Sequence, residues 1–332
     1  MIVLSNQDVD KLFSMKTAID VVEKVMIDVS DGKVNIPRRF TVDVGAPNRM
    51  GVMPGAMLTE SEGGKRYFGM KMLSLYPENP KYGYSSHQGA MVLFDSEYGS
   101  AVAMMNADLL TAVRTAAASA VATRALAREK VSVLAIIGTG EQADHHIDAM
   151  LAVRNFDVVH IAGRDFGKAE ALAHRASVRH SNVSFVPGAA FDTAIGEADV
   201  VCTVTAAAEP FIETDWVKPS THLNIVGSSI PSMREIHPEL VARSALFVDY
   251  RDSTLTAAGE VMEAIEKGLI SQDHIRGEIG EVLSGKVRGR RSDREITLYR
   301  SLGIVAQDLA AAAWIYEQAL SSGIGAKVTL VL

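Results

Sequence analysis

Hydrophobic residues recur at two different spacings in the first third of the chain, and they predict a helix followed by a sheet. Between residues 5 and 31 the spacing is helical, and Ser5 stands at the expected N-cap with Asp8 following it. Short segments broken by glycine and proline then predict antiparallel strands and turns at 38–44, 51–55, 67–77 and 89–106. The alanine-rich segment 107–129, which contains no proline or glycine, predicts a long helix.

The pattern changes at residue 131, where a nearly continuous apolar run begins. The run at 131–138 is typical of a strand that is buried on both faces of a parallel sheet. Further strands, separated by helical segments, are expected at 157–163, 183–187, 199–205, 221–227 and 245–250. Strands that alternate with helices indicate parallel βαβ units. Helices are then predicted at 254–269, 272–284 and 301–323.

Length and composition exclude several classes of protein. The 332 residues, 48% of them hydrophobic, suffice for two domains. The single cysteine, Cys202, excludes an internal disulfide and a zinc site of paired cysteines. The net charge of -7 makes nucleic acid a poor partner. The first residues lack a secretory signal, and no apolar run reaches the roughly 18 residues that a membrane helix needs. We therefore expect a cytoplasmic protein without membrane or nucleic-acid partners and without a metal site.

A glycine-rich turn follows the run at 131–138 and opens the next helix. It matches the pattern G-x-G-x-x-G/A and comprises Gly138, Thr139, Gly140, Glu141, Gln142 and Ala143. The first glycine permits a tight turn, the second lets a pyrophosphate approach the backbone, and the small last residue lets helix and strand pack closely. Amides at the helix N-terminus then bind the phosphates. Among repeated strand–helix alternations, this turn predicts a dinucleotide-binding domain rather than a purely structural turn.

These patterns together predict an α/β protein with two domains. One is a Rossmann-type domain with a doubly wound parallel sheet, expected at 121–300. The other is a discontinuous α+β domain, expected to combine residues 1–120 with residues 301–332.

The choice between NAD and NADP is made at the end of the second strand of such a domain. An acidic residue there binds the ribose hydroxyls of NAD, whereas an arginine suits the 2′-phosphate of NADP. Here the strand ends in Gly163, Arg164 and Asp165. Arg164 favours NADPH slightly, although it is also consistent with a solvated side chain, and a small register shift would bring Asp165 to the ribose.

Motifs in the right order along nearly the whole chain resemble the ornithine cyclodeaminase/mu-crystallin family. They are GVMP at 51–54, Lys71, SHQ at 86–88, LFD at 93–95, LTAVRTAA at 110–117, GTGEQA at 138–143, WVKP at 216–219, NIVG at 224–227, SLG at 301–303 and Asp308. This family includes ornithine and lysine cyclodeaminases, an alanine dehydrogenase branch, and ketimine and imino-acid reductases. The resemblance implies a homodimer, built from a substrate-binding and dimerisation domain and a Rossmann domain. It also implies hydride transfer at the α-carbon of an amino acid or its imine.

The resemblance further implies which residues bind substrate and cofactor. Those matching the positions that bind the substrate carboxylate are Arg38 or Arg39, Lys71 and Arg114. Guanidinium and ammonium groups bind carboxylates well. Because Lys71 and Arg114 lie in apolar stretches, their charges need an internal partner or a ligand, a structural ion pair being the alternative. The cofactor residues expected beyond the glycine-rich turn and 163–165 are Thr205, Val226 and Gly227.

One position departs from the cyclodeaminase pattern. Cyclodeaminases and the alanine dehydrogenase branch carry an aspartate in the loop after the NIVG strand, where this chain has Ser229 and so resembles the ketimine reductases. A serine hydroxyl is a poor general base near neutral pH. Reduction of an imine, however, needs only hydride delivery, carboxylate anchoring and proton balance. The expected catalytic residues are Lys71, Ser229 and His87, with Asp308 or Glu235 as alternatives for proton transfer.

The sequence therefore predicts an NAD(P)H-dependent reductase that converts an α-imino acid to the L-amino acid. A cyclic ketimine such as pyrroline-2-carboxylate would need an apolar wall, for which the candidates are Met53, Met70, Met72 and Leu75. A linear imine such as iminosuccinate would need a second cationic anchor, which the pair Arg38 and Arg39 can supply. The alternatives are an ornithine cyclodeaminase or alanine dehydrogenase that uses NAD, and a non-catalytic protein that binds the cofactor or a small ligand.

Overall fold

The computed structural model describes residues 1–188 and 190–329, except for the side chains of Pro80 and His87. The chain forms two compact units. The first unit combines residues 1–114 with the chain from residue 304 onward, and the second unit holds residues 115–303. The chain therefore passes from the first unit to the second within helix α3 (Ala107–Leu126) and returns after residue 303.

In the described part of the second unit, eight parallel strands form one sheet. They are β8 (Val133–Ile137), β9 (Val158–Ala162), β10 (Ser184–Pro187), β11 (Val200–Thr203), β12 (His222–Ile225), β13 (Ala245–Val248), β14 (Ile275–Glu278) and β15 (Thr297–Arg300). Their order across the sheet is β10-β9-β8-β11-β12-β15-β13-β14, so the winding reverses between β8 and β11. This doubly wound parallel sheet confirms the predicted fold class. Sheets of this kind bind ligands at the reversal point, outside the carboxyl ends of the strands.

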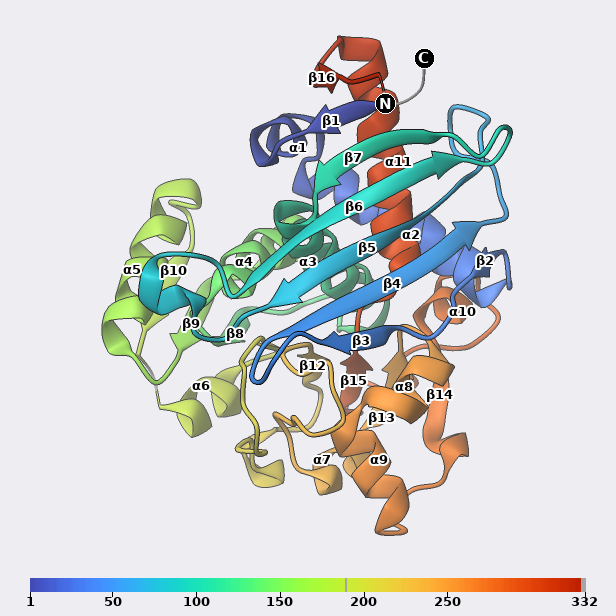
Figure 1. Cartoon of the computed structure of the whole chain (residues 1–332). Helices are drawn as coiled ribbons and strands as arrows, with labels where there is room; N and C mark the ends of the chain where they lie inside the picture. Colours follow the sequence, from blue (N-terminus) through green and yellow to red (C-terminus); the bar gives the residue numbers. More distant parts are fainter. Residues whose placement is uncertain (189, 330–332) are drawn as a thin grey trace. The chain divides into compact units, whose positions relative to one another are not determined.

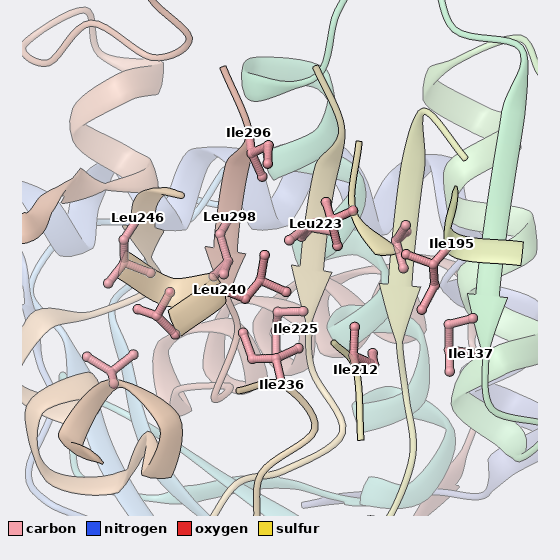
Figure 2. Close-up of a cluster of buried hydrophobic side chains, with 14 of the residues drawn as sticks. Ile137, Ile195, Ile212, Leu223, Ile225, Ile236, Leu240, Leu246, Ile296 and Leu298 are labelled. Atoms are coloured by element: carbon pink, nitrogen blue, oxygen red, sulfur yellow. The ribbon is translucent and has the colours of Figure 1, made fainter. Parts of the chain in front are cut away.

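Helices connect these strands and cover the sheet. They are α4 (Glu141–Val153), α5 (Phe166–Arg179), α6 (Phe191–Glu197), α7 (Pro238–Arg243), α8 (Arg251–Ala257), α9 (Gly259–Glu266) and α10 (Ile279–Leu283), with 3-10 turns at Thr214–Trp216 and Gln272–His274. Figure 2 shows a cluster of buried aliphatic side chains in which Ile195 of α6 and Leu240 of α7 join Leu223 and Leu298 of the sheet. Ile137, the residue before the glycine-rich turn, belongs to the same cluster. The hydrophobic core thus extends to the strand end from which that turn begins.

The first unit contains a second sheet, which is mostly antiparallel. Its strands are β1 (Ile2–Leu4), β2 (Val34–Asn35), β3 (Phe40–Asp43), β4 (Arg49–Met57), β5 (Tyr67–Leu75), β6 (His87–Asp95), β7 (Ala101–Asn106) and β16 (Ala326–Lys327). Across the sheet they follow the order β16-β1-β7-β6-β5-β4-β2, and β3 also pairs with β4. Strands β1 and β7 run parallel, whereas the other paired strands run antiparallel.

Helices α1 (Asn6–Leu12), α2 (Met15–Ser30) and α11 (Val305–Ser322) pack in the same unit, which also has a 3-10 turn at Asn79–Tyr82. Helix α11 crosses one face of the sheet and contacts β4, β5 and β6, as Figure 1 shows. Tyr67 of β5 and Tyr316 of α11 meet edge to face with ring centroids 5.9 Å apart. No helix in the described part of the chain is long and apolar enough to cross a membrane.

Two predicted helices are each divided into a pair. The helix expected at 5–31 breaks because Phe13 ends α1 and Ser14 caps α2, with the Ser14 hydroxyl accepting a hydrogen bond from the amide of Thr17 at 3.2 Å. The helix expected at 254–269 is similarly split into α8 and α9, which meet at Ala258. In both cases the hydrophobic spacing continues across the break, and at the first break the Ser14 cap begins the new helix.

The prediction after residue 270 is wrong in two places. The helix expected at 272–284 contains strand β14 at its centre, and the α-helical part is limited to α10. Strand β15 is absent from the prediction, although it lies between β12 and β13 in the sheet. Its first and last residues, Thr297 and Arg300, are polar but fully buried, so β15 lacks a continuous apolar run.

Candidate active site

The glycine-rich turn between β8 and α4 adopts a backbone that requires its first glycine. Gly138 has φ +131°, a conformation that residues with a side chain rarely adopt. A Cβ here would lie 2.8 Å from the carbonyl oxygen of Val204, which is closer than packing allows. The amide of Gly138 donates to the carbonyl of Ala162 at the end of β9, at 2.8 Å. The turn is therefore held against the ends of both strands that flank β8.

The second glycine leaves space at the N-terminus of α4. Gly140 is the N-cap of this helix, and no side chain among the described residues caps it. A Cβ added to Gly140 would meet no atom within 4 Å. Ala143 is fully buried, so the first turn of the helix packs closely in the unit. This geometry fits the pyrophosphate of a dinucleotide, because helix amides and the helix dipole attract an anion that has room to approach.

The other residues expected to bind the cofactor lie at the same edge of the parallel sheet. Those after β9 are Gly163, Arg164 and Asp165, the one after β11 is Thr205, and those after β12 are Val226 and Gly227. A Cβ on Gly163 would lie 2.6 Å from Cγ2 of Thr139, so this position also needs glycine. The Arg164 side chain is exposed. The Asp165 carboxylate instead caps α5 and accepts a hydrogen bond from the amide of Lys168 at 3.1 Å.

Glu235 ties the ends of β11 and β12 together. Its Oε1 accepts hydrogen bonds from the amide and hydroxyl of Thr205, and its Oε2 from the Thr203 hydroxyl and the Gly227 amide, all at 2.7 to 2.8 Å. Burial raises the pKa of Glu235, and the four donors act in the opposite direction. A Cβ on Gly227 would lie 2.1 Å from the carbonyl oxygen of Thr205. With both oxygens engaged, Glu235 is placed to hold this sheet edge rather than to transfer a proton.

The loop after β12 carries Ser229, the position at which the chain departs from the cyclodeaminase pattern. Ser229 is exposed. Its neighbour Ser228 is buried, and Nη2 of Arg300 donates to its carbonyl at 2.7 Å and to its hydroxyl at 2.8 Å. Arg300 also pairs with Glu260, which is fully buried as well. The loop is thus anchored one residue before Ser229. His87 begins β6 in the first unit, and its side chain lies outside the described part of the structure.

Two cations that the sequence singled out meet in the interior of the first unit. Lys71 of β5 is 1% exposed and Arg114 of α3 is 4% exposed. Both donate to the same oxygen, Oδ1 of Asp308 in α11, each at 2.8 Å. Nη1 of Arg114 also donates to Oε1 of Gln307 at 2.8 Å. The Thr111 hydroxyl, three residues before Arg114 on α3, accepts from Lys71 at 3.4 Å. We refer to Lys71, Arg114, Gln307 and Asp308 as the cationic cluster.

The cationic cluster has an excess of positive charge when Lys71 is protonated. Burial, reinforced by the charge of Arg114, lowers the pKa of Lys71 from 10.5 to about 7, although Asp308 acts in the opposite direction. Arg39 also lowers this pKa. Arg39 is half-buried and Arg38 is exposed, so Arg39 is the member of the pair whose charge reaches Lys71. A buried site with more cations than anions favours the binding of a carboxylate.

The apolar wall expected around Lys71 is only partly correct. Side chains alternate between the two faces of a strand, so Met70 and Met72 lie on the opposite face of β5 from Lys71. Met53 of β4 is the cross-strand partner of Lys71 and shares its face, and Leu75 lies on that face of β5 as well. Met70 and Met72 are therefore excluded from the wall beside Lys71, whereas Met53 and Leu75 remain on the correct face.

Sequence reasoning missed Gln307 and treated Asp308 as a secondary alternative. Both are fully buried in the first turn of α11, a helix that is otherwise mostly apolar along its buried length. The sequence signal that could have found them is the pair of adjacent polar residues within an otherwise apolar helix, because a buried charge requires a partner. The identity of the partner does not follow from the pattern, since Asp308 lies 194 residues after Arg114.

The second unit has a doubly wound parallel sheet with a glycine-rich turn at its reversal point, and the first unit holds a buried cationic cluster. These features place the protein in the class of two-unit α/β proteins built like dinucleotide-dependent oxidoreductases. The sequence model of the ornithine cyclodeaminase/mu-crystallin family matches residues 1–323. The chain belongs to this family, which confirms the resemblance found in its motifs.

Several characterised proteins are similar over the whole length. The ketimine reductase mu-crystallin of Mus musculus is 35% identical over 320 residues, which cover 95% of this chain and 96% of that protein. The Δ1-pyrroline-2-carboxylate reductase of Thermococcus litoralis, solved in complex with NADH and L-proline, is 32% identical with a TM-score of 0.93, covering 99% of this chain and 100% of that chain. An archaeal alanine dehydrogenase dimer with bound NAD is 29% identical with a TM-score of 0.92, covering 100% of this chain and 99% of that chain.

Proposed function

We propose that the protein is an oxidoreductase that uses NADH or NADPH to reduce an α-imino acid to the L-amino acid. The observation that carries the proposal is the cationic cluster, where the charges of Lys71 and Arg114 exceed that of Asp308 in a buried site. Such a site suits the carboxylate of an α-imino acid. Family membership supports the reaction class, because the relatives described above include reductases of ketimines and of pyrroline-2-carboxylate.

In this proposal Arg114 is the main anchor of the substrate carboxylate. Asp308 accepts a hydrogen bond from its Nε, and Gln307 accepts one from its Nη1. The guanidinium is thus oriented by two bonds, and the planar fork of an arginine suits a carboxylate. Arg39 adds positive potential at the same place. A second arginine would also serve the distal carboxylate of a linear imino diacid, so both classes of imine belong in the substrate test.

Lys71 is assigned as the proton donor to the imine nitrogen. Reduction of an imine adds a hydride to carbon and a proton to nitrogen, and the reduced nicotinamide supplies the hydride when it is bound. A general acid works best when its pKa is close to the working pH. The pKa of Lys71, about 7, meets that condition. Ser229 is assigned a hydrogen-bonding role, and His87 remains a candidate for the same proton transfer.

The second unit is assigned to cofactor binding. The open space at Gly140 and the uncapped α4 would hold the pyrophosphate, with Gly163, Thr205 and the loop at 226–227 placed along the same sheet edge. Arg164 is available at the end of β9, whereas Asp165 is engaged as a helix cap. This difference supports NADPH over NADH as the preferred coenzyme.

The proposal is tested by following the near-ultraviolet absorbance of NADH or NADPH with the purified protein. The imine sources are pyrroline-2-carboxylate, oxaloacetate with ammonia, and pyruvate with ammonia, and ornithine with NAD is run in parallel. Oxidation of the cofactor with one of the imines is expected, and it would also identify the substrate and the coenzyme. Ammonia release from ornithine without imine reduction would instead make the protein a cyclodeaminase.

Arg164→Ala is expected to weaken the use of NADPH while leaving NADH almost unchanged. Loss of one charge-assisted hydrogen bond at an exposed position should raise KM for NADPH about tenfold. The measurement is the ratio of kcat/KM for the two coenzymes. Asp165→Asn is the matched control, because asparagine also caps helices and the substitution removes an adjacent charge of the opposite sign. Equal effects of Arg164→Ala on both coenzymes would show that Arg164 does not discriminate between them.

We also propose that two copies of the chain associate through the open face of the first unit's sheet. Helix α11 lies on the face that carries Lys71. The opposite face carries apolar side chains that include Phe68, Met70, Met72, Val92, Phe94 and Met104. Phe68 and Phe94 stack with centroids 5.1 Å apart, and Met104 is 40% exposed. A contiguous apolar surface of this kind requires a cover, and a related alanine dehydrogenase is described as a dimer.

Met70→Asp should convert the dimer to a monomer at micromolar protein concentration. A carboxylate on this face would lose its hydration if the face were covered, at a cost of several kcal/mol per copy, about enough to separate the subunits. Sedimentation or light scattering gives the mass. Leu269→Asp, which adds the same charge at an exposed apolar position in the second unit, is the control. A Met70→Asp variant that keeps the wild-type mass would exclude this face as the interface.

A further inference from the structure

Asp308 joins both cations of the cationic cluster through one oxygen atom. Its Oδ1 accepts from Lys71 and from Arg114, each at 2.8 Å, while Oδ2 is buried without a hydrogen-bond partner among the described residues. The carboxylate lies in the first turn of α11, where the helix dipole favours a negative charge. A single oxygen shared in this way fixes the ammonium of Lys71 and the guanidinium of Arg114 relative to each other.

Stability alone does not account for this arrangement. Buried ion pairs contribute little net stability compared with well-packed apolar side chains, because removing the charges from water is costly. Here the cost is increased by a second cation and by an unpartnered carboxylate oxygen. The four residues come from β5, α3 and α11, so three elements converge on a polar contact that the hydrophobic core does not need.

We propose that Asp308 is a positioning residue with two roles. It orients Arg114 as the carboxylate anchor, and it keeps Lys71 in its ammonium form as the proton donor. This inference rests on the proposed imine reductase function. Arg114 has a second hydrogen-bond acceptor in Gln307, whereas the anion with which Lys71 forms an ion pair is Asp308. Removing Asp308 should therefore affect Lys71 in a way that removing Gln307 does not.

The charged groups that face Lys71 come from each packed element. Arg114 on α3 and Arg39 before β3 both disfavour its protonated form, and Asp308 on α11 favours it. Thr111 on α3 contributes a neutral hydroxyl. Since one anion opposes two cations and burial, loss of that anion must lower the pKa of Lys71 below its value of about 7.

The test compares the pH dependence of kcat/KM for Asp308→Asn and the wild type. If Lys71 acts as an acid, the wild-type activity should fall as the pH rises through about 7. In Asp308→Asn this fall should move to lower pH by about one unit or more. The protonation of the imine itself is common to both enzymes and does not contribute to the difference. An unchanged pH profile in Asp308→Asn would overturn the proposal.

Gln307→Leu is the matched control from the same turn of α11. It removes the acceptor for Nη1 of Arg114 without changing any charge. We expect KM for the imino acid to rise about fivefold to tenfold, with the pH profile in its wild-type position. A shift of the profile in Gln307→Leu equal to that in Asp308→Asn would mean that packing, and not the charge of Asp308, sets the state of Lys71.

A second variant guards against failure of Asp308→Asn to fold. Asp308→Glu keeps the charge but lengthens the side chain, so kcat should fall about tenfold through misplacement of the two cations. Its pH profile should remain within a few tenths of a unit of the wild type, since the anion is still present. A profile displaced by a full unit in Asp308→Glu would contradict the assignment.

Thermal unfolding tests the effect of Asp308 on the pKa of Lys71 without a measurement of enzyme activity. The pKa of Lys71 is lower in the folded state than in the unfolded state, so stability rises with pH between about 7 and 10.5. In Asp308→Asn that rise should begin at lower pH, and the variant should lose more Tm than the wild type between pH 7 and about pH 5. In the double variant that combines Asp308→Asn with Lys71→Met, the extra loss of Tm should disappear. If the wild type reduces no imine, the proposed function fails while this measurement still decides the role of Asp308.

Discussion

Lys71→Met should reduce kcat/KM for the imino acid by about 10³-fold, the largest loss expected from any single change in the first unit. The substitution removes both the proposed proton donor and one of the charges that attract the substrate carboxylate. Methionine has nearly the same length and suits a buried site, and Arg114 would remain paired with Asp308 as a neutral couple. The fold should therefore survive, and steady-state kinetics should report the loss of the ammonium group.

Binding of the reduced coenzyme distinguishes this loss from a general defect. Lys71→Met should bind NADH or NADPH as the wild type does, measured by cofactor fluorescence. Lys65→Met, at an exposed position of the same unit, should keep wild-type activity. Turnover that survives Lys71→Met would remove Lys71 from the reaction and reduce the cationic cluster to a structural feature.

Gly140→Val should weaken binding of the nicotinamide coenzyme by about 100-fold without unfolding the protein. A Cβ at Gly140 meets no atom within 4 Å, so the added side chain would extend into the space assigned to the pyrophosphate. The backbone at this residue, with φ -87° and ψ -172°, is one that valine readily adopts. The loss of an N-cap glycine should cost less than about 1 kcal/mol of stability. Titration of cofactor fluorescence and a thermal unfolding curve measure the two effects separately.

Gly138→Ala changes the same turn, but it should act by destabilising the fold and not by filling the space assigned to the coenzyme. Its methyl group would meet the carbonyl of Val204 at 2.8 Å on a backbone with φ +131°, so about 1–3 kcal/mol of folding stability should be lost. Binding should weaken in this variant only together with a lower Tm. If Gly140→Val bound the coenzyme normally, the pyrophosphate would have to lie elsewhere on the protein.

The fold and the cofactor turn were accessible from sequence because both depend on local features. Alternating buried strands and helices define the doubly wound sheet, and the backbone at Gly138 is a property that glycine alone satisfies well. Strand β15 was not accessible for the opposite reason. Its place beside β12 is determined by partners far along the chain, while its own residues Thr297 and Arg300 resemble those of a loop.

The cationic cluster could likewise be predicted only in part. Lys71 and Arg114 could be identified because they match the positions that the family resemblance implies for carboxylate binding, and because a charge within an apolar stretch needs a partner. Their connection through Asp308 could not, because it joins residues separated by 237 and 194 positions. The assignment of Met70 and Met72 to the substrate wall was wrong for a simpler reason. Strand alternation places both residues on the face opposite Lys71, so proximity in sequence to Lys71 was misleading.

The edges of the first unit's sheet have a consequence for how copies of the chain can assemble. In the described structure one edge ends in the two-residue strand β16, and the other is shared by the two-residue β2 and the four-residue β3. Short edge strands present few unpaired amide and carbonyl groups, which discourages the strand-by-strand addition that leads to fibrils. If two copies associate through the apolar face as proposed, these short edges should limit assembly to a closed pair. At high concentration the protein should therefore stay in solution as a species of constant mass instead of growing into aggregates.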